Sequence, residues 1–264
     1  MKLEAHHIRA LKGKRQLTEL NCFTPEQAVA AEQAGVEMIV SGWKRDRAAI
    51  RAAAPNTHYC FGLIHGEHVT PDAALRDAFD GLNAGADSIY CAMHYDVIAA
   101  LAREGIPVVG HVGFVPQKAR MTGTRAFGKT AADARAVMDA VRRYEDAGAF
   151  AIEMEIVAAP VATAISRATP LTVISMGSGG GCDVQYLFAI DVLGETTGRI
   201  PRHSRVYDDF KSEYARLHDR RVAAFARFRD DVTSGQFPDA SESVALAEDD
   251  ALAIFLANPR AQDS

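Results

Sequence analysis

The sequence lacks the cysteine patterns of a disulfide framework or a zinc ribbon, because its four cysteines stand singly with no Cys-x-x-Cys pair. It also lacks an excess of positive charge. Its 29 lysines and arginines against 34 acidic residues give a net charge of -5, which argues against a nucleic-acid partner. The longest apolar runs, at 107–116 and 150–165, are too short or too interrupted to span a bilayer. Residues 1–15 lack the apolar core of a signal peptide. We therefore expect a cytoplasmic protein that binds neither nucleic acid nor membrane.

A unit of strand, short loop, capped helix and glycine recurs along the chain. Four glycines stand where a helix ends and an apolar run of strand length begins: Gly35, Gly85, Gly105 and Gly148. Three threonines stand where helices begin, and proline follows two of them at the first helical position: Thr24, Thr70 and Thr130. The pattern predicts strands near 17–23, 37–42, 58–63, 87–92, 107–112, 150–155, 171–176 and 186–191.

Eight such units predict an α/β fold in which the strands close into a (β/α)8 TIM barrel. No linker interrupts the series before about residue 195, so we expect residues 1–264 to form a single barrel domain. Apolar residues at helical spacing predict further helices at 207–235 and 245–258. These form an expected C-terminal helical extension over 207–258, whose apolar side suits packing on the barrel or on a neighbouring subunit.

Two stretches, GHVGFVPQ at 110–117 and the block 147–194, carry a family resemblance that extends over roughly residues 15–240. They resemble ketopantoate hydroxymethyltransferase. The resemblance implies a barrel of the phosphoenolpyruvate mutase and isocitrate lyase superfamily, whose members act on 2-oxo acids and assemble into homo-oligomers. The named family transfers a hydroxymethyl group from methylenetetrahydrofolate to 3-methyl-2-oxobutanoate. A divalent metal chelates the oxo acid there, and a glutamate helps to remove the C3 proton.

The resemblance also implies catalytic roles for two residues. Glu155 matches the glutamate that ends the sixth strand, which makes it the expected general base. His111 matches the histidine of the GHVG sequence, and its flanking Gly110 and Gly113 permit close approach to a ligand. Glu153 shares the strand face of Glu155, either as a second inward-facing acid or as a structural partner one layer deeper.

Five further residues are expected to bind the substrate near the strand ends: Ser41, Lys44, Tyr90, His94 and His65. Lys44 would supply positive charge for a carboxylate or an enolate, although the KRDR sequence equally suits a solvated helix start. The three histidines His65, His94 and His111 follow neighbouring strands, so they are expected on one face of the barrel. A polar pocket rim is the favoured interpretation, and a histidine-bound zinc site is the alternative. His58, at the other end of its strand, belongs to the opposite face.

The sequence departs from the family where the resemblance implies three metal-binding acids. Counting without gaps places Trp43, Gly62 and Ala92 at those positions, and Tyr90 replaces the family's lysine. An indole and two small groups cannot supply the hard oxygen donors that Mg²⁺ requires. We therefore predict that the family's magnesium site is absent and that no metal is held there. The loop after the second strand is also much shorter than in the family, which reshapes the pocket.

These observations predict an enzyme that forms or breaks a C–C bond next to the carbonyl of a small 2-oxo acid or related carboxylate. Methylenetetrahydrofolate is the co-substrate that the resemblance implies. One alternative is a lyase, hydrolase or isomerase for another small carboxylate, with a histidine-bound metal or none. A second alternative is a non-catalytic relative that binds a metabolite or a partner through the same end of the barrel.

Overall fold

The computed structural model describes residues 2–42, 46–68, 70–245 and 255–259. The chain divides into two compact units, Met1–Asp209 and Phe210–Ser264. The boundary lies close to residue 207, where the helical extension was expected to begin. Whether the two units form one domain stays a prediction.

The first unit is a closed barrel of eight parallel strands, each hydrogen-bonded to the next and the last to the first. The strands are β1 (Leu17–Asn21), β2 (Met38–Gly42), β3 (His58–Gly62), β4 (Ser88–Tyr90), β5 (Val108–Gly113), β6 (Ala151–Glu155), β7 (Thr172–Met176) and β8 (Val184–Phe188). The predicted TIM barrel is confirmed. The last strand spans Val184–Phe188 rather than the expected 186–191, because residues Ala189–Val192 form a short helix, α9.

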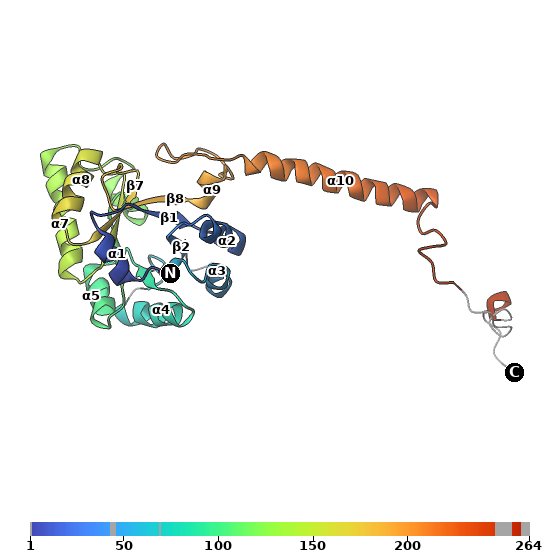
Figure 1. Cartoon of the computed structure of the whole chain (residues 1–264), viewed down its shortest axis with the longest axis horizontal. Helices are drawn as coiled ribbons and strands as arrows, with labels where there is room; N and C mark the ends of the chain where they lie inside the picture. The colour runs from blue at the N-terminus through green and yellow to red at the C-terminus, as the bar shows by residue number, and fades with distance from the viewer. Residues whose placement is uncertain (1, 43–45, 69, 246–254, 260–264) are drawn as a thin grey trace. The chain divides into compact units, whose positions relative to one another are not determined.

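Helices surround the barrel in Figure 1. They are α1 (Ala5–Leu11), α2 (Pro25–Gln33), α3 (Arg47–Ala53), α4 (Pro71–Asn83), α5 (Tyr95–Arg103), a 3-10 turn (Pro116–Lys118), α6 (Ala119–Thr122), α7 (Ala131–Asp146), α8 (Ala159–Ala168) and α9. The threonines at 24, 70 and 130 cap α2, α4 and α7, as predicted, by accepting hydrogen bonds from backbone N–H groups three residues later. The connection from β7 to β8 is a loop, residues 177–183.

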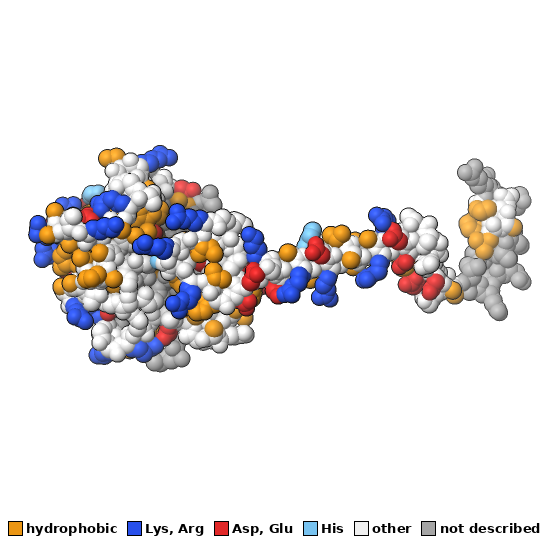
Figure 2. Space-filling model, turned by 90° about the horizontal axis from the view of Figure 1, so that it is seen from above, with side chains coloured by type: hydrophobic (Ala, Val, Ile, Leu, Met, Phe, Trp, Pro, Cys, Tyr) orange, Lys and Arg blue, Asp and Glu red, His pale blue; other side chains and the backbone are white. Residues whose placement is uncertain are grey.

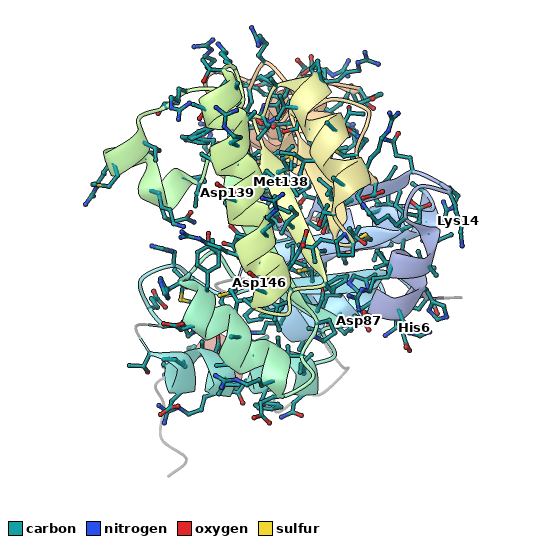
Figure 3. All side chains as sticks on the ribbon, turned by 90° about the vertical axis from the view of Figure 1, so that its left-hand side faces the viewer. His6, Lys14, Asp87, Met138, Asp139 and Asp146 are labelled. Atoms are coloured by element: carbon teal, nitrogen blue, oxygen red, sulfur yellow. The ribbon has the colours of Figure 1, made fainter. Side chains whose placement is uncertain are left out.

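Helix α7 shows how the outer layer packs. Val137, Val141 and Tyr144 are buried at helical spacing, whereas Asp139 and Asp146 remain exposed. Figure 3 shows these two acids on α7. A second apolar cluster fills the inside of the barrel, formed by side chains on the inward faces of the strands. It includes Leu17, Met38, Val40, Cys60, Val109, Ala151, Ile174, Val184 and Tyr186. By the two-residue period of a strand, Glu19, His111, Glu153 and Glu155 also face inward.

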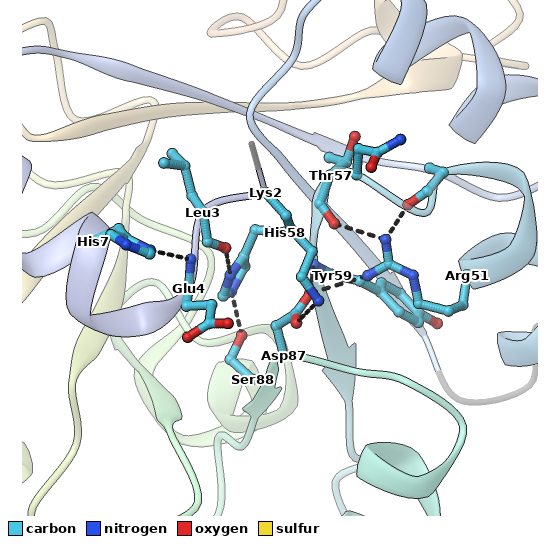
Figure 4. A network of polar contacts seen from close by, with 12 residues as sticks. Lys2, Leu3, Glu4, His7, Arg51, Thr57, His58, Tyr59, Asp87 and Ser88 are labelled. Carbon is cyan, nitrogen blue, oxygen red and sulfur yellow. Dashed lines mark hydrogen bonds and ion pairs between the residues drawn. The ribbon is translucent and has the colours of Figure 1, made fainter.

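The amino-terminal end of the barrel is closed by a polar network beside α1, drawn in Figure 4. His58 contacts the Leu3 carbonyl oxygen through Nδ1 and the Ser88 hydroxyl through Nε2, both at 2.9 Å. Asp87 pairs with Lys2 and with Arg51. Both ring nitrogens of His58 are therefore occupied at this end, which confirms that His58 lies opposite the predicted pocket.

The second unit contains α10 (Phe210–Ser234), which confirms the helix expected at 207–235. Its apolar side chains are exposed beside charged ones, as Figure 2 shows. The helix expected at 245–258 falls mostly on residues 246–254, outside the described residues. Within the described ranges, no helix combines the length and apolar character needed to cross a membrane.

Gly110 allows α7 to pack closely against the strand that carries His111. A Cβ atom at position 110 would lie 2.4 Å from ring atoms of Tyr144, which is buried and held by an aromatic contact to Tyr95. We predict that Gly110→Ala lowers the free energy of unfolding by about 1–3 kcal/mol, since the ring must move. Gly105→Ala is unsuitable as a control because its φ is positive, so Gly42→Ala serves, where the added atom meets nothing. Equal urea midpoints for both variants would contradict the prediction.

Candidate active site

A cavity of about 520 Å³ opens at the carboxyl ends of the strands, where TIM barrels place their active sites. Its polar lining residues are Asn21, Ser41, His65, Tyr90, His111, Gln117, Glu153, Glu155 and Tyr186. A cavity of about 620 Å³ lies at the opposite ends of β1 and β8, between residues 12–16 and 180–183. That second cavity contains none of the predicted site residues, so the first is the candidate active site.

The imidazole of His111 is the centre of this site. Its Nδ1 lies 2.7 Å from the Tyr90 hydroxyl oxygen and 3.5 Å from Oε2 of Glu153. Its Nε2 lies 3.2 Å from Oε2 of Glu155. The register explains these contacts, because His111 of β5 stands directly opposite Glu153 of β6, and Glu155 follows two residues later on the same face.

The two ring nitrogens of His111 differ in their hydrogen bonding. Burial raises the pKa of Tyr90 well above its ordinary value, so the hydroxyl keeps its proton, and we assign it as the donor to Nδ1. In the neutral ring the remaining proton then sits on Nε2. Although Nε2 is near Glu155, their geometry does not make a hydrogen bond, and this buried nitrogen has no partner. It is therefore a hydrogen-bond donor available to a bound molecule.

Glu155 ends β6 at a point of backbone strain. The next residue, Ile156, has a φ of 51°, and within the described ranges it is the one non-glycine residue with a positive φ. A β-branched residue in this region is unfavourable by about 1–3 kcal/mol, and such strain clusters at functional sites. The turn is fixed by the Ile156 N–H donating to the Met176 carbonyl oxygen at 2.8 Å. It ends the strand at the residue whose carboxyl group lies beside His111.

Two more acids lie inside the barrel, Glu19 and Glu153, and Glu153 also lines the cavity. Burial raises the pKa of Glu19 from 4.5 to about 8, and Oε2 of this carboxyl has no hydrogen-bond partner. Burial, followed by the charges of Glu19 and Glu155, raises the pKa of Glu153 well above its ordinary value. At neutral pH Glu19 is therefore mainly protonated, and the surroundings of Glu153 favour its uncharged form.

The structure places five of the seven predicted site residues at the cavity: Glu155, His111, Tyr90, His65 and Ser41. The hydroxyl of Tyr90 is engaged with Nδ1 of His111. Ser41 also lines the cavity, but its hydroxyl lies 2.6 Å from that of Tyr59, so it is already engaged. His94 instead caps α5, accepts from the Asp96 N–H, and has a side chain that is 71% exposed. Lys44 lies outside the described residues. The roles of all seven stay predictions.

The two glycines beside His111 serve packing within the protein. The space at Gly110 faces Tyr144, and a Cβ at Gly113, whose φ is 83°, would meet the Glu155 carbonyl oxygen at 2.2 Å. The expected close approach to a ligand is therefore not what these glycines provide. Their effect on the site is indirect, since they set how closely α7 and β6 approach the strand of His111.

The donor set in the cavity does not fit the magnesium site that the family resemblance implies. Gly62 lines the cavity and Ala92 is buried, and neither has a ligand atom in its side chain. The cavity's two carboxyl groups lie at different nitrogens of His111 rather than converging on one point. Among the described residues, the side chains that come close enough to share a metal are Glu4, His6 and His7, on α1. His65, His94 and His111 are not among these side chains, so the alternative of a histidine-bound zinc stays a prediction.

Three polar lining residues were not predicted from the sequence: Asn21, Gln117 and Tyr186. Asn21 donates to the Tyr186 hydroxyl at 3.0 Å across the β1–β8 pair. Gln117 belongs to the GHVGFVPQ sequence, and the 3-10 turn there brings it to the cavity. The strand period through Leu17 and Glu19 would have indicated Asn21, since it is the next inward position of β1.

Comparison with known proteins identifies, over most of the chain, the family that the sequence motifs resemble. The family model described as ketopantoate hydroxymethyltransferase matches residues 44–240. A 3-methyl-2-oxobutanoate hydroxymethyltransferase of Chloroflexus aurantiacus is 34% identical over 90% of this chain and 91% of its own. The enzyme of that name from Oleidesulfovibrio alaskensis is 30% identical over 94% and 92%. Among solved structures, a phosphonopyruvate hydrolase superposes with a TM-score of 0.54 at 17% identity over 98% of this chain and 99% of its own, which reflects a shared fold.

The buried acid Glu19 predicts a stability that falls as pH rises. Between pH 4.5 and about 8 the unfolded chain loses this proton while the folded protein keeps it, so each pH unit there costs about 1.4 kcal/mol. We predict that Glu19→Gln, which cannot ionise, unfolds with a free energy at least about 1 kcal/mol higher than wild type at pH 8. The difference should shrink toward pH 4.5 in urea titrations.

The matched control for this prediction is Glu104→Gln, at an exposed position after α5. It should follow the wild-type pH dependence. A Glu19→Gln variant whose stability curve also parallels wild type between pH 4.5 and 8 would show that Glu19 is ionised in the folded protein.

Proposed function

Because this chain belongs to the ketopantoate hydroxymethyltransferase family, an enzyme family, we propose that it makes or breaks a C–C bond at C3 of a small 2-oxo acid, with Glu155 as the base and without the family's metal. One observation carries the proposal: a buried carboxyl group and an unpartnered imidazole N–H face the same cavity 3.2 Å apart. Proton abstraction next to a carbonyl needs these two functions, a base at carbon and a donor at oxygen.

The chemical step follows from this pairing. The Glu155 carboxylate takes the C3 proton, and the electron pair of the broken C–H bond moves into an enolate whose negative charge develops on the C2 oxygen. The Nε2–H of His111 donates to that oxygen. Tyr90 fixes the ring by donating to Nδ1, so that the proton is held on Nε2 where the oxygen needs it. With methylenetetrahydrofolate as co-substrate, water would release its one-carbon unit as formaldehyde and leave tetrahydrofolate. The nucleophilic C3 then attacks the carbonyl carbon of formaldehyde, the C2 carbonyl re-forms, and the resulting alkoxide takes the proton held by Glu155. The reverse sequence cleaves the C–C bond.

The proposed substrate is the 2-oxo acid that the relatives' names give, 3-methyl-2-oxobutanoate, or a carboxylate of similar size. A cavity of about 520 Å³ suits such a molecule. Methylenetetrahydrofolate remains the proposed co-substrate on the strength of the family. His65 at the cavity, together with Lys44, would meet the substrate's polar groups, and this part rests on the sequence alone.

We predict that the wild-type protein exchanges the C3 proton of 3-methyl-2-oxobutanoate for deuterium in D₂O, and that Glu155→Gln lowers the rate about 100-fold or more. Proton NMR of the substrate measures the exchange. Glu104→Gln, at the exposed C-cap of α5 and outside the cavity lining, should exchange at the wild-type rate. Treatment with EDTA, followed by metal analysis of the protein, should leave the wild-type rate unchanged.

Two outcomes would contradict this proposal. Exchange that persists at the wild-type rate in Glu155→Gln would show that Glu155 is not the base. Exchange that disappears with EDTA and returns with Mg²⁺ would mean that a metal acts at this site after all.

We also propose that the protein is a cytoplasmic homo-oligomer. The family resemblance supports both parts, and the exposed Leu217, Val222 and Phe225 on α10 support the second, because large apolar side chains in a row are typical of interfaces. We predict that Val222→Ser combined with Phe225→Ser lowers the mass measured by light scattering after size-exclusion chromatography. Arg220→Ser on the same helix is the control. An unchanged mass in the double variant would exclude α10 as the contact.

A further inference from the structure

We infer that Glu153 is a substrate-binding residue whose neutral carboxyl group donates a hydrogen bond to the carboxylate of the bound oxo acid. The inference rests on the proposed function, because it assumes that a 2-oxo acid occupies this cavity. It adds a residue that acts on the other end of the substrate from Glu155.

The cavity presents an electrostatic problem for an anion. Within the described ranges, the residues that line it include Glu153 and Glu155 but neither a lysine nor an arginine. If both acids were ionised, a substrate carboxylate would enter a buried site that already held two negative charges, and their repulsion would oppose binding. One acid must serve as the base. The other therefore has to be neutral for the anion to bind.

The carboxyl group of Glu153 has no use within the protein that would occupy its proton. It is 5% exposed and lines the cavity, and its contact among the described residues is Nδ1 of His111 at 3.5 Å. That distance is beyond an ordinary hydrogen bond, and Nδ1 already accepts from Tyr90 at 2.7 Å. A buried acid held for structural reasons has its proton bonded to an acceptor. Within the described part of the chain no acceptor is bonded to this carboxyl group, which leaves its proton for a bound ligand.

Its surroundings keep this carboxyl protonated. The titratable groups that face it come from five other positions around the barrel: Glu19 of β1, Cys60 of β3, Tyr90 of β4, His111 of β5 and Tyr186 of β8, in addition to Glu155 of its own strand. Burial is the main cause of the raised pKa of Glu153, and the charges of Glu19 and Glu155 raise it further. A carboxylic acid kept neutral in this way is an effective donor to an oxyanion, because O–H···O⁻ bonds are short and strong.

Two unpartnered donors thus face one cavity, the Nε2–H of His111 and the O–H of Glu153. Adjacent strands hold them, since the two residues are register partners across the β5–β6 pair. A 2-oxo acid carries its keto oxygen and its carboxylate on adjacent carbons. The arrangement therefore suits the keto oxygen at His111 and the carboxylate at Glu153, with C3 left near Glu155.

The test is the affinity of the full-length protein for 3-methyl-2-oxobutanoate, measured by isothermal titration calorimetry between pH 7 and 10. Glu153→Gln keeps a neutral donor and should bind within about 3-fold of wild type at pH 7. Glu153→Leu has no donor and should bind about 10-fold or more weakly. In wild type the affinity should fall as pH rises toward the pKa of Glu153. In Glu153→Gln this fall should be absent.

Glu19→Gln gives a second readout that a merely structural role would not move. The charge that Glu19 acquires above pH 8 opposes ionisation of Glu153, so its removal should shift the alkaline loss of affinity to lower pH. Lys44→Met tests the cation predicted from the sequence. If Lys44→Met abolishes binding while Glu153→Leu binds like wild type, the carboxylate is held by Lys44 and the inference is overturned.

Circular dichroism reports whether Glu153→Leu folds. If it does not, the pH dependence of affinity is compared between wild type and Glu153→Gln. An equal alkaline fall in affinity in both proteins overturns the inference. Glu155→Gln should still bind the oxo acid. If wild type binds it with the Glu153 dependence described but never exchanges its C3 proton, the proposed catalysis fails while the assignment of Glu153 stands.

Discussion

The hydrogen bond from the Tyr90 hydroxyl to Nδ1 of His111 is the interaction on which the rest of the site depends. It joins β4 to β5 at 2.7 Å inside the barrel, and with the hydroxyl assigned as the donor it leaves the ring proton on Nε2. Because that proton is directed to Nε2, the side of the ring that faces Glu155 becomes a donor rather than an acceptor. If the ring held its proton on Nδ1 instead, Nε2 would repel the oxygen that it is proposed to stabilise. A tyrosine at this position is therefore a chemical element of the site.

The barrel makes this arrangement rigid at the expense of stability. Three glutamates, Glu19, Glu153 and Glu155, are placed in an interior where most inward residues are apolar. A buried acid is tolerated when it stays neutral, and the raised pKa values of Glu19 and Glu153 meet that condition. The strained turn at Ile156 adds a further cost beside Glu155. Both features are unfavourable for folding alone, which is typical of residues retained for a reaction.

The sequence predicted the parts of the fold that are governed by local rules. Threonine caps and the glycines that end helices located the elements, and the period of two identified which strand residues face inward, including Glu153 and Glu155. It did not reveal what each histidine contacts. His94 is a helix cap and His68 bonds to Asp77, because tertiary neighbours, absent from the linear pattern, engage them. The space beside Gly110 was likewise assigned to a ligand, when only the packing of α7 shows that Tyr144 fills it.

The proposed loss of the metal and the neutral acids of the interior are connected by charge balance. A site built for a divalent cation gathers carboxylates, and without the cation those carboxylates would repel one another and any anionic substrate. The chain has Gly62 and Ala92 where the resemblance implies metal-binding acids, which removes two of these charges. Burial favours the protonated form of Glu19 and Glu153 in the barrel interior. In the proposed reaction, Glu155 is then the carboxylate that acts as a base, and hydrogen-bond donors provide the stabilisation of oxygen that the family resemblance assigns to the cation.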